Sequence, residues 1–177
     1  QRALRNWSVD ARLAVQIGII GGGPVGSIAG LALKSKGHAV RLFDPSTHKP
    51  KMSLALSETT LSLLENIGVH LMAGQDLVEI LVTEKGLPGS MLQNAHECGH
   101  PRFGRAICSR ELDHRLTEQV ASMVEPSAVT YVRARTNKGG PRIELETGET
   151  LEPDLVILAD GGRSGLSENL GMGAQLR

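Results

Sequence analysis

Aromatic side chains are scarce in this sequence, since phenylalanine, tyrosine and tryptophan make up only 2% of its 177 residues. A folded core must therefore be built from aliphatic side chains. The two cysteines are too few for a disulfide framework, which makes a reducing compartment the default expectation. No hydrophobic run approaches the roughly 18 residues that a membrane-spanning helix needs.

An excess of either charge is also missing, because 19 lysines and arginines balance 19 aspartates and glutamates. Without surplus cations to neutralise phosphates, the chain is not expected to bind nucleic acid. Hydrophobic residues make up 40% and charged residues 21%, as in an ordinary globular protein. The length suits one domain of moderate size.

Residues 1–13 carry three arginines but no uninterrupted apolar stretch, so we do not expect them to be a secretory signal peptide. We expect them to form an N-terminal extension outside the folded domain. An organellar presequence and a cloning remnant both stay open as its origin.

A strand, a turn, a helix and a second strand are predicted near the beginning of the sequence. The apolar run Ala14–Ile20 has the pattern of a buried parallel strand. A helix begins at Pro24 and ends before Gly37. A second strand covers Ala39–Asp44. Such a βαβ unit makes its two strands parallel.

The turn in this unit carries the pattern G-x-G-x-x-G at Gly21, Gly23 and Gly26. The first glycine permits the tight turn, the second lets a pyrophosphate approach the main chain, and the third allows close helix–strand packing. The amides of the first helical turn would then face the phosphates. Asp44 follows Gly26 by eighteen residues and ends the next strand, where it can bind a ribose diol. Because its carboxylate repels a 2′-phosphate, FAD or NAD is expected rather than NADP.

After residue 69 the regular alternation of strands and helices stops. Residues 70–105 indicate inserted β structure, with a loop around a hairpin over 90–104, and a helix follows from Ser109 to Met123. A fully apolar strand returns only at Leu155–Ala159 and ends in Asp160-Gly161. This interruption favours a flavoprotein over an NAD-dependent dehydrogenase, which stays open as the alternative. Asp160 should lie at the same sheet edge as the glycine turn.

The string LVILADGGRSGL, from Leu155 to Leu166, resembles the second fingerprint of the class A flavoprotein aromatic hydroxylases. Further strings, in the order IGIIGGGPVGSIAGLAL, LALSETTLSLLENIGV, VTEKGLPGSML, FGRAICSRELDHRL and ELETGETLEPDLVILADG, resemble the ubiquinone-biosynthesis hydroxylases. Among these, the 2-polyprenyl-6-methoxyphenol hydroxylase branch is the most similar. The resemblance covers roughly residues 15–173.

The resemblance implies a doubly wound, Rossmann-like α/β FAD-binding domain over residues 14–177, with the inserted β structure at about 70–105. It implies the N-terminal part of a longer enzyme whose substrate domain is largely missing. The intact enzyme would use FAD, NAD(P)H and O2 to hydroxylate a lipophilic polyprenylated phenol. It would be cytoplasmic, and association with the inner membrane surface or with a biosynthetic complex stays open. A truncated, non-catalytic nucleotide-binding fragment is the other alternative.

The residues expected to contact the cofactor come from the fingerprints and from the family resemblance. They are Gly21, Gly23, Gly26, Asp44, Arg110, Asp160 and Gly161. Arg110 matches a flavin-contacting arginine of many relatives, but it is equally well explained as a solvated residue at a helix start. Asp160-Gly161 is alternatively a turn that ends a strand.

Two family positions differ here, because Met52 and Ser167 stand where many relatives carry arginine. The sequence identifies no catalytic side chain. His96, Cys98 and His100 lie close together, but without a paired C-x-x-C motif we expect no metal site.

Overall fold

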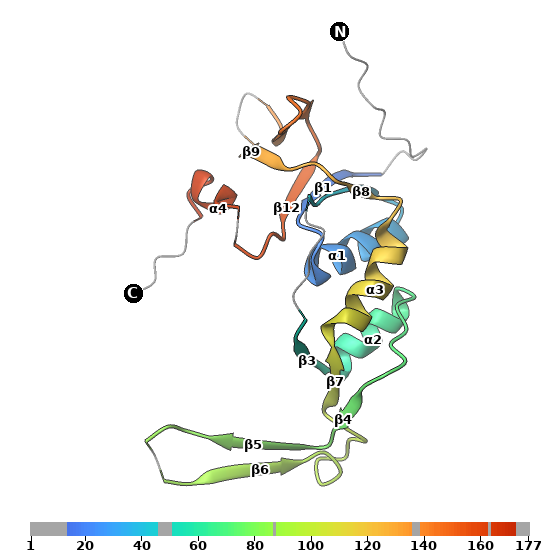
Figure 1. Cartoon of the computed structure of the whole chain (residues 1–177), viewed down its shortest axis with the longest axis vertical. Helices are drawn as coiled ribbons and strands as arrows, with labels where there is room; N and C mark the ends of the chain where they lie inside the picture. Colours follow the sequence, from blue (N-terminus) through green and yellow to red (C-terminus); the bar gives the residue numbers. More distant parts are fainter. Residues whose placement is uncertain (1–13, 46–50, 87, 136–138, 163, 173–177) are drawn as a thin grey trace. The chain divides into compact units, whose positions relative to one another are not determined.

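The computed structural model describes residues 14–45, 51–86, 88–135, 139–162 and 164–172. Contacts within the chain divide it into two units. The first combines Gln1–Lys49 with Leu116–Arg177, and the second is Pro50–Arg115. The first unit is thus built from the two ends of the sequence and the second from its middle (Figure 1).

A four-stranded parallel sheet forms the centre of the first unit. Its strands are β1 (Gln16–Ile20), β2 (Ala39–Phe43), β8 (Val124–Glu125) and β12 (Leu155–Leu158), in the spatial order β12-β1-β2-β8. All three strand pairs are parallel. The chain leaves β1 towards β2 and β8 and later returns to β12 on the other side of β1. Ligands of doubly wound sheets bind beyond the carboxyl ends of the strands at such a switch point.

The register of the sheet brings the ends of three strands together. Ile20 of β1 lies opposite both Phe43 of β2 and Leu158 of β12. Beyond these pairs, the Gly21 amide donates to the Phe43 carbonyl at 2.9 Å, and the Ala159 amide donates to the Ile20 carbonyl at 2.7 Å. The residues that follow β1, β2 and β12 therefore share one edge of the sheet.

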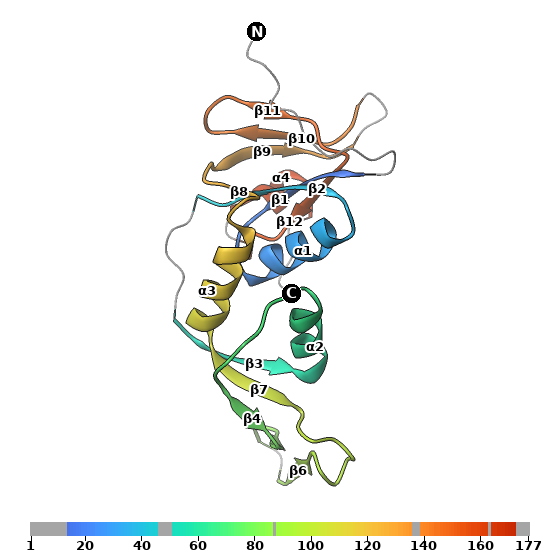
Figure 2. The ribbon, with the colours of Figure 1, turned by 90° about the vertical axis from the view of Figure 1, so that its right-hand side faces the viewer.

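The two faces of this sheet are covered differently, because successive side chains of β1 point to opposite faces. Ile17 and Ile19 pack on one face with Ala29 and Leu33 of α1 (Pro24–Ser35). Ile20 packs on the other face against a three-stranded antiparallel sheet. That sheet consists of β9 (Val129–Arg133), β10 (Arg142–Leu145) and β11 (Thr150–Leu151). Figure 2 shows these three layers. As the composition predicts, the core is aliphatic, with Phe43 as a buried aromatic exception.

The second unit contains two small antiparallel sheets and helical segments. One sheet has the order β3-β7-β4, from β3 (Ser53–Ser57), β7 (Gly104–Cys108) and β4 (Gln75–Leu77). The other is a hairpin of β5 (Glu79–Thr83) and β6 (Ser90–Asn94). Helix α2 (Glu58–Asn66) follows β3, and α3 (Ser109–Val120) begins in this unit and ends in the first.

Ion pairs connect the elements of the second unit. The Arg102 guanidinium contacts Glu58 at 2.7 Å and Asp76 at 3.1 Å, and Arg105 contacts Asp76 at 2.9 Å. The hydrogen bond from Arg102 lowers the pKa of the Glu58 carboxyl, and that from Arg105 lowers the pKa of Asp76. The first residue of α2 is thereby joined to β4 and to the chain entering β7.

Three expectations about local structure need correction. The segment 90–104, expected as a loop around a hairpin, begins with a strand, because Ser90–Asn94 pairs with β5 as strand β6. The helix expected to continue to Met123 ends at Val120, and the chain turns before entering β8. Near the end of the described chain, α4 (Leu166–Asn169) is a short helix that the sequence did not predict.

Candidate functional site

The glycine bend after β1 is shaped by two glycines that the chain itself requires. Gly21 has a φ of +105°, in the region that side chains rarely adopt, and a Cβ placed on it would lie 2.8 Å from the Cα of Asp160. A Cβ on Gly26 would collide with the Gly21 carbonyl oxygen. Any side chain at either position would therefore push α1 or the strand β12 away from the bend.

Gly23 lacks a side chain for a different reason. Its backbone is extended, with φ −66° and ψ 178°, which any residue adopts. No atom of the described residues lies within 4 Å of the position that its Cβ would occupy. Gly23 is the N-cap of α1, so this open face lies at the positive end of the helix. The space that a side chain would fill is available to a ligand.

The first turn of α1 presents its amides next to this open face. The first intrahelical hydrogen bond runs from the Ser27 amide to the Gly23 carbonyl at 2.9 Å. The amides of Val25 and Gly26 precede it, and Pro24 has none to offer. Helix geometry therefore aims two N–H groups at the region where an anion would bind.

Asp44 lies directly against the glycine bend. A Cβ placed on Gly22 would come within 2.8 Å of the Asp44 Cβ and closer still to its carboxylate. The Asp44 amide donates to the Glu125 carbonyl at 3.1 Å, which continues the β2–β8 pairing and fixes the backbone at this point. An ionisable carboxyl group is thus held within contact distance of the turn that precedes α1.

Sequence analysis missed two residues of this bend. Because Gly22 has no side chain, Asp44 can approach the bend. The G-x-G-x-x-G pattern does not specify which residue stands at position 22. Ser27 is fully buried, and its hydroxyl donates to the Gly22 carbonyl at 3.1 Å. A run of three glycines and a serine on the apolar face of a helix were the available signals.

Asp160 uses its carboxylate to shape the loop that follows β12. One oxygen accepts the Gly162 amide at 3.0 Å, and the other accepts the Ser164 amide at 3.2 Å and the Ser164 hydroxyl. The hydroxyl first, and then these amides, lower the pKa of Asp160, so that it is ionised at neutral pH. Gly161 and Gly162 have φ values of +68° and +73°. The loop therefore depends on glycine at both positions and on one charged acceptor.

Six of the seven residues expected to contact a cofactor lie in the first unit. Around the bend, Gly21 lies against Asp160 and Gly26 lies against Gly21. Asp44 lies against Gly22, the residue next to Gly21. Gly23 adjoins them at the start of α1, and Gly161 follows Asp160. Arg110 is an exposed residue of α3 in the second unit. The contacts of all seven with a cofactor stay predictions.

The described part of the chain has no group of three or more histidine, cysteine, aspartate or glutamate side chains arranged to hold a metal ion. Its helices, as far as they are described, include none with the length and apolar character to cross a membrane.

The model of a known protein family, the FAD binding domain, matches residues 14–176 of this sequence. The chain belongs to the FAD-binding domain family. The geometry of the bend fits this family. Dinucleotide-binding folds need space for the pyrophosphate at the helix start, where Gly23 is open, and an acid for the ribose at the end of the second strand, where Asp44 lies.

Two curated proteins with similar sequences are named as hydroxylases. Ubiquinone hydroxylase UbiL of Rhodospirillum rubrum is 27% identical over 170 residues, which are 88% of this chain and 39% of that protein. Hispidin-3-hydroxylase of Neonothopanus nambi is 27% identical over 157 residues, covering 82% of this chain and 37% of that protein. The chain thus spans about two fifths of the length of these relatives.

Solved structures of FAD-binding proteins share the fold at lower identity. PqsL of Pseudomonas aeruginosa, a probable FAD-dependent monooxygenase, matches with a TM-score of 0.72 and 18% identity, over 93% of this chain and 47% of that one. CtdE in complex with FAD matches with a TM-score of 0.64 and 21% identity, over 88% and 40%. The family match and these folds confirm the predicted doubly wound α/β FAD-binding domain, with FAD as the cofactor of the family.

Proposed function

We propose that the glycine bend holds the adenosine diphosphate half of FAD. Gly23 lets the pyrophosphate approach the main chain, and the amides of Val25 and Gly26 donate to its oxygens. Asp44 accepts hydrogen bonds from the ribose hydroxyls. The single observation that carries this assignment is the contact of Asp44 with the bend beside an open, side-chain-free helix start.

Asp160, Gly161 and Arg110 complete the proposed cofactor contacts. The ionised Asp160 keeps its loop folded beside Gly21, and Gly161 exposes main chain there. Arg110 supplies a cation to the flavin or its phosphates. When bound, FAD supplies the redox chemistry and the activation of O2, and these residues bind and orient it.

We propose that the longer protein is an FAD-dependent monooxygenase, which uses NAD(P)H and O2 to hydroxylate an aromatic ring. The names of both curated relatives support hydroxylation, and one of them supports a ubiquinone precursor. The substrate would then be a lipophilic polyprenylated phenol, met in the cytoplasm or at the inner membrane surface. Because the chain spans about two fifths of these relatives, this activity belongs to a longer protein.

A second candidate is a non-catalytic nucleotide-binding protein. The contacts proposed for the ADP half of FAD all lie within this chain, which favours this candidate for the chain as it stands. The two proposals share the nucleotide site and differ only in turnover.

The nucleotide site is tested by titrating the chain with FAD, FMN and NADP+ and following flavin fluorescence or heat of binding. We expect binding of FAD, weak or absent binding of FMN, which lacks the ADP group, and rejection of NADP+ by the Asp44 carboxylate. The substitution Asp44→Ala should weaken FAD binding by about tenfold or more, because one or two hydrogen bonds to a charged group are lost.

Asp154→Ala is the matched control. Its carboxylate accepts the Gln16 amide at 2.9 Å, at the opposite end of the same strands. That variant should bind FAD as the parent chain does. Equal affinity for FMN and FAD would contradict the proposed pyrophosphate contacts. Full FAD affinity in Asp44→Ala would contradict the proposed ribose contact.

A further inference from the structure

Ser109 is a buried polar residue at the first position of α3, with only 4% of its surface exposed. It is bonded to the chain that enters β3. The Ser109 hydroxyl accepts the Met52 amide at 3.1 Å, and the Ser109 amide donates to the Met52 carbonyl at 2.8 Å. These two bonds extend the pairing of Ser53 with Cys108 by one residue. The start of α3 is therefore fastened to the first strand of the second unit.

Glu111 fastens a different segment to the same helical turn. Its Oε1 accepts the Met72 amide at 2.6 Å and the Ala73 amide at 3.0 Å. Both amides belong to the connection between α2 and β4. Hydrogen bonds to an ionised carboxylate are about twice as strong as those between neutral groups. Two of the first three residues of α3 are thus held by main-chain groups of other segments.

Arg110 stands between these two residues in the sequence and is engaged differently. Its side chain is exposed, and within the described ranges no residue forms a hydrogen bond or an ion pair with its guanidinium. Arg102 and Arg105 of the same unit, in contrast, contact Glu58 and Asp76. A guanidinium that is left to water, on a backbone fixed at both neighbouring residues, is available to an anionic or polar ligand.

We propose, on the basis of the cofactor contact assigned to Arg110 under the proposed function, that Ser109 and Glu111 are positioning residues. They fix the backbone of Arg110 so that its guanidinium meets the flavin or its phosphates. Such a contact gains affinity when the backbone that carries it is already in place, because binding otherwise has to order it. Both residues accept amides from other segments, so their bonds fix where the first turn of α3 lies within the second unit.

A double-mutant cycle on FAD affinity tests the proposal. Arg110→Gln should weaken FAD binding by about tenfold or more, and Ser109→Ala should weaken it by about three- to tenfold. Because Ser109 acts through Arg110, Ser109→Ala should change the affinity by less than about twofold once Arg110 is replaced by glutamine. Ser109→Thr keeps a hydroxyl and should restore most of the affinity. Glu111→Ala, measured in the same two backgrounds, should behave like Ser109→Ala and provides the test at a less buried residue.

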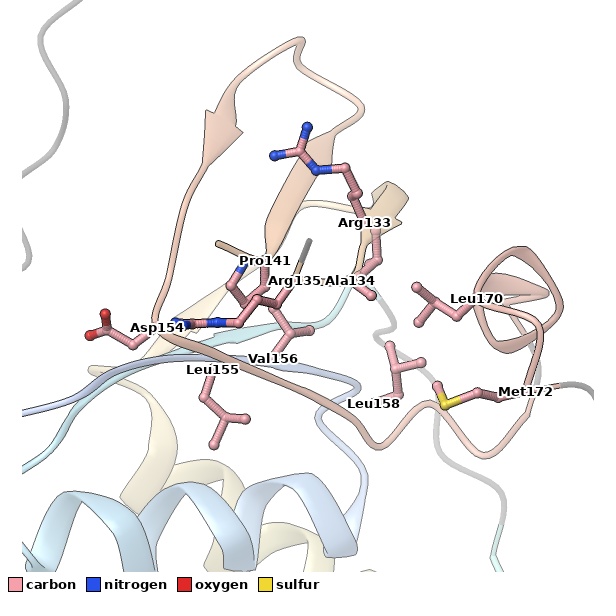
Figure 3. A pocket seen from close by; sticks show the side chains of 11 residues that line it. Arg133, Ala134, Arg135, Pro141, Asp154, Leu155, Val156, Leu158, Leu170 and Met172 are labelled. Atoms are coloured by element: carbon pink, nitrogen blue, oxygen red, sulfur yellow. The ribbon is translucent and has the colours of Figure 1, made fainter. Parts of the chain in front are cut away.

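Two matched controls separate positioning from folding and from net charge. Ser57→Ala removes a hydroxyl that accepts the Thr60 amide at 3.2 Å at the start of α2, so it should lower thermal stability and leave FAD affinity unchanged. Arg135→Gln removes the charge of an exposed arginine. Figure 3 shows it lining a cavity of about 540 Å³ together with Asp154, which precedes β12. It should also leave FAD affinity unchanged, because Asp160 follows the opposite end of that strand.

Three results would overturn the proposal. The first is full FAD affinity in both Ser109→Ala and Glu111→Ala. The second is a loss in Ser109→Ala that multiplies with the loss in Arg110→Gln, or that Ser57→Ala reproduces, because the hydroxyl would then act on folding alone. The third is full FAD affinity in Arg110→Gln, which leaves no contact to position. None of these results bears on the ribose contact, which Asp44→Ala tests separately.

Discussion

Gly23 and Gly26 lack side chains for opposite reasons, and a methyl group at each position separates ligand binding from folding. At Gly26 the methyl group meets the Gly21 carbonyl, so Gly26→Ala should lower the free energy of unfolding by about 1–3 kcal/mol or more. At Gly23 the methyl group meets no described atom. Gly23→Ala should therefore lower the free energy of unfolding by less than about 1 kcal/mol, because alanine is a poorer N-cap than glycine. FAD affinity should nevertheless fall about tenfold or more in Gly23→Ala.

Urea unfolding and FAD titration of the same samples measure both effects. Val25→Ala is the control for the first turn of α1, because Val25 is 72% exposed and its truncation leaves the backbone unchanged. It should alter neither quantity strongly. If Gly23→Ala destabilised the chain as much as Gly26→Ala, the open face at Gly23 would have a structural and not a ligand-binding explanation.

The residues of the bend show what a sequence pattern can and cannot identify. The spacing of Gly21, Gly23 and Gly26 between a strand and a helix predicts a tight turn with space for a ligand, because the chain leaves no room for a Cβ at Gly21 and Gly26, whereas Gly23 leaves the helix start open. The contact between Gly22 and Asp44 is not predictable from spacing, since it depends on how far the end of β2 reaches across the sheet. The Asp160 carboxylate bonds within its own loop, as expected for the alternative interpretation of Asp160-Gly161 as a turn that ends a strand.

At the scale of elements, the strands with apolar runs were predicted correctly. Strands β1 and β12 have short apolar runs typical of parallel strands, and both are present, although β1 is largely buried and β12 is only partly buried. Strand β6 was missed because its sequence, Ser-Met-Leu-Gln-Asn, has no clear alternation and all but one of its residues are exposed. Its pairing comes from β5, with Leu92 opposite Leu81, and a partner strand leaves no mark in the local sequence.

The loop after β12 gives a prediction at the same scale. In Ser164→Ala the hydroxyl that donates to Asp160 is lost, so the pKa of Asp160 should rise towards its ordinary value of 3.8. Because the folded-state pKa lies below the unfolded one, the ionised carboxylate stabilises the loop above about pH 3.8. That contribution is lost as the pH falls through the folded-state pKa. At neutral pH the variant should lose about 1 kcal/mol of stability.

Carboxyl-carbon NMR of the chain labelled with 13C-aspartate follows this titration directly. Ser122→Ala is a suitable control, because its hydroxyl accepts a hydrogen bond from Lys34, far from the loop in sequence, and has no part in the contacts of Asp160. An Asp160 titration midpoint that is the same with and without the Ser164 hydroxyl would contradict the assigned role of that hydrogen bond.

At the scale of the whole molecule, the proposed contacts hold one end of a long cofactor. The pyrophosphate and one ribose would be contacted by Gly23, the first turn of α1 and Asp44. Hydroxylation, in contrast, happens at the flavin ring. Hydroxylation also requires an oriented phenol and the exclusion of water around it. The curated relatives use more than twice this length of polypeptide, so binding and turnover should separate in this chain.

We therefore expect the 177-residue chain to bind FAD and to form no hydroxylated product. The measurement incubates the FAD-loaded chain with NADH or NADPH, oxygen and a short-chain prenylated phenol, and quantifies the product by chromatography with mass detection. Free FAD at the same concentration, with catalase present, corrects for NAD(P)H oxidation by unbound flavin. Product above this background, abolished by Asp44→Ala, would show that the chain contains the whole catalytic apparatus. Binding without product would agree with a substrate site that lies outside these 177 residues.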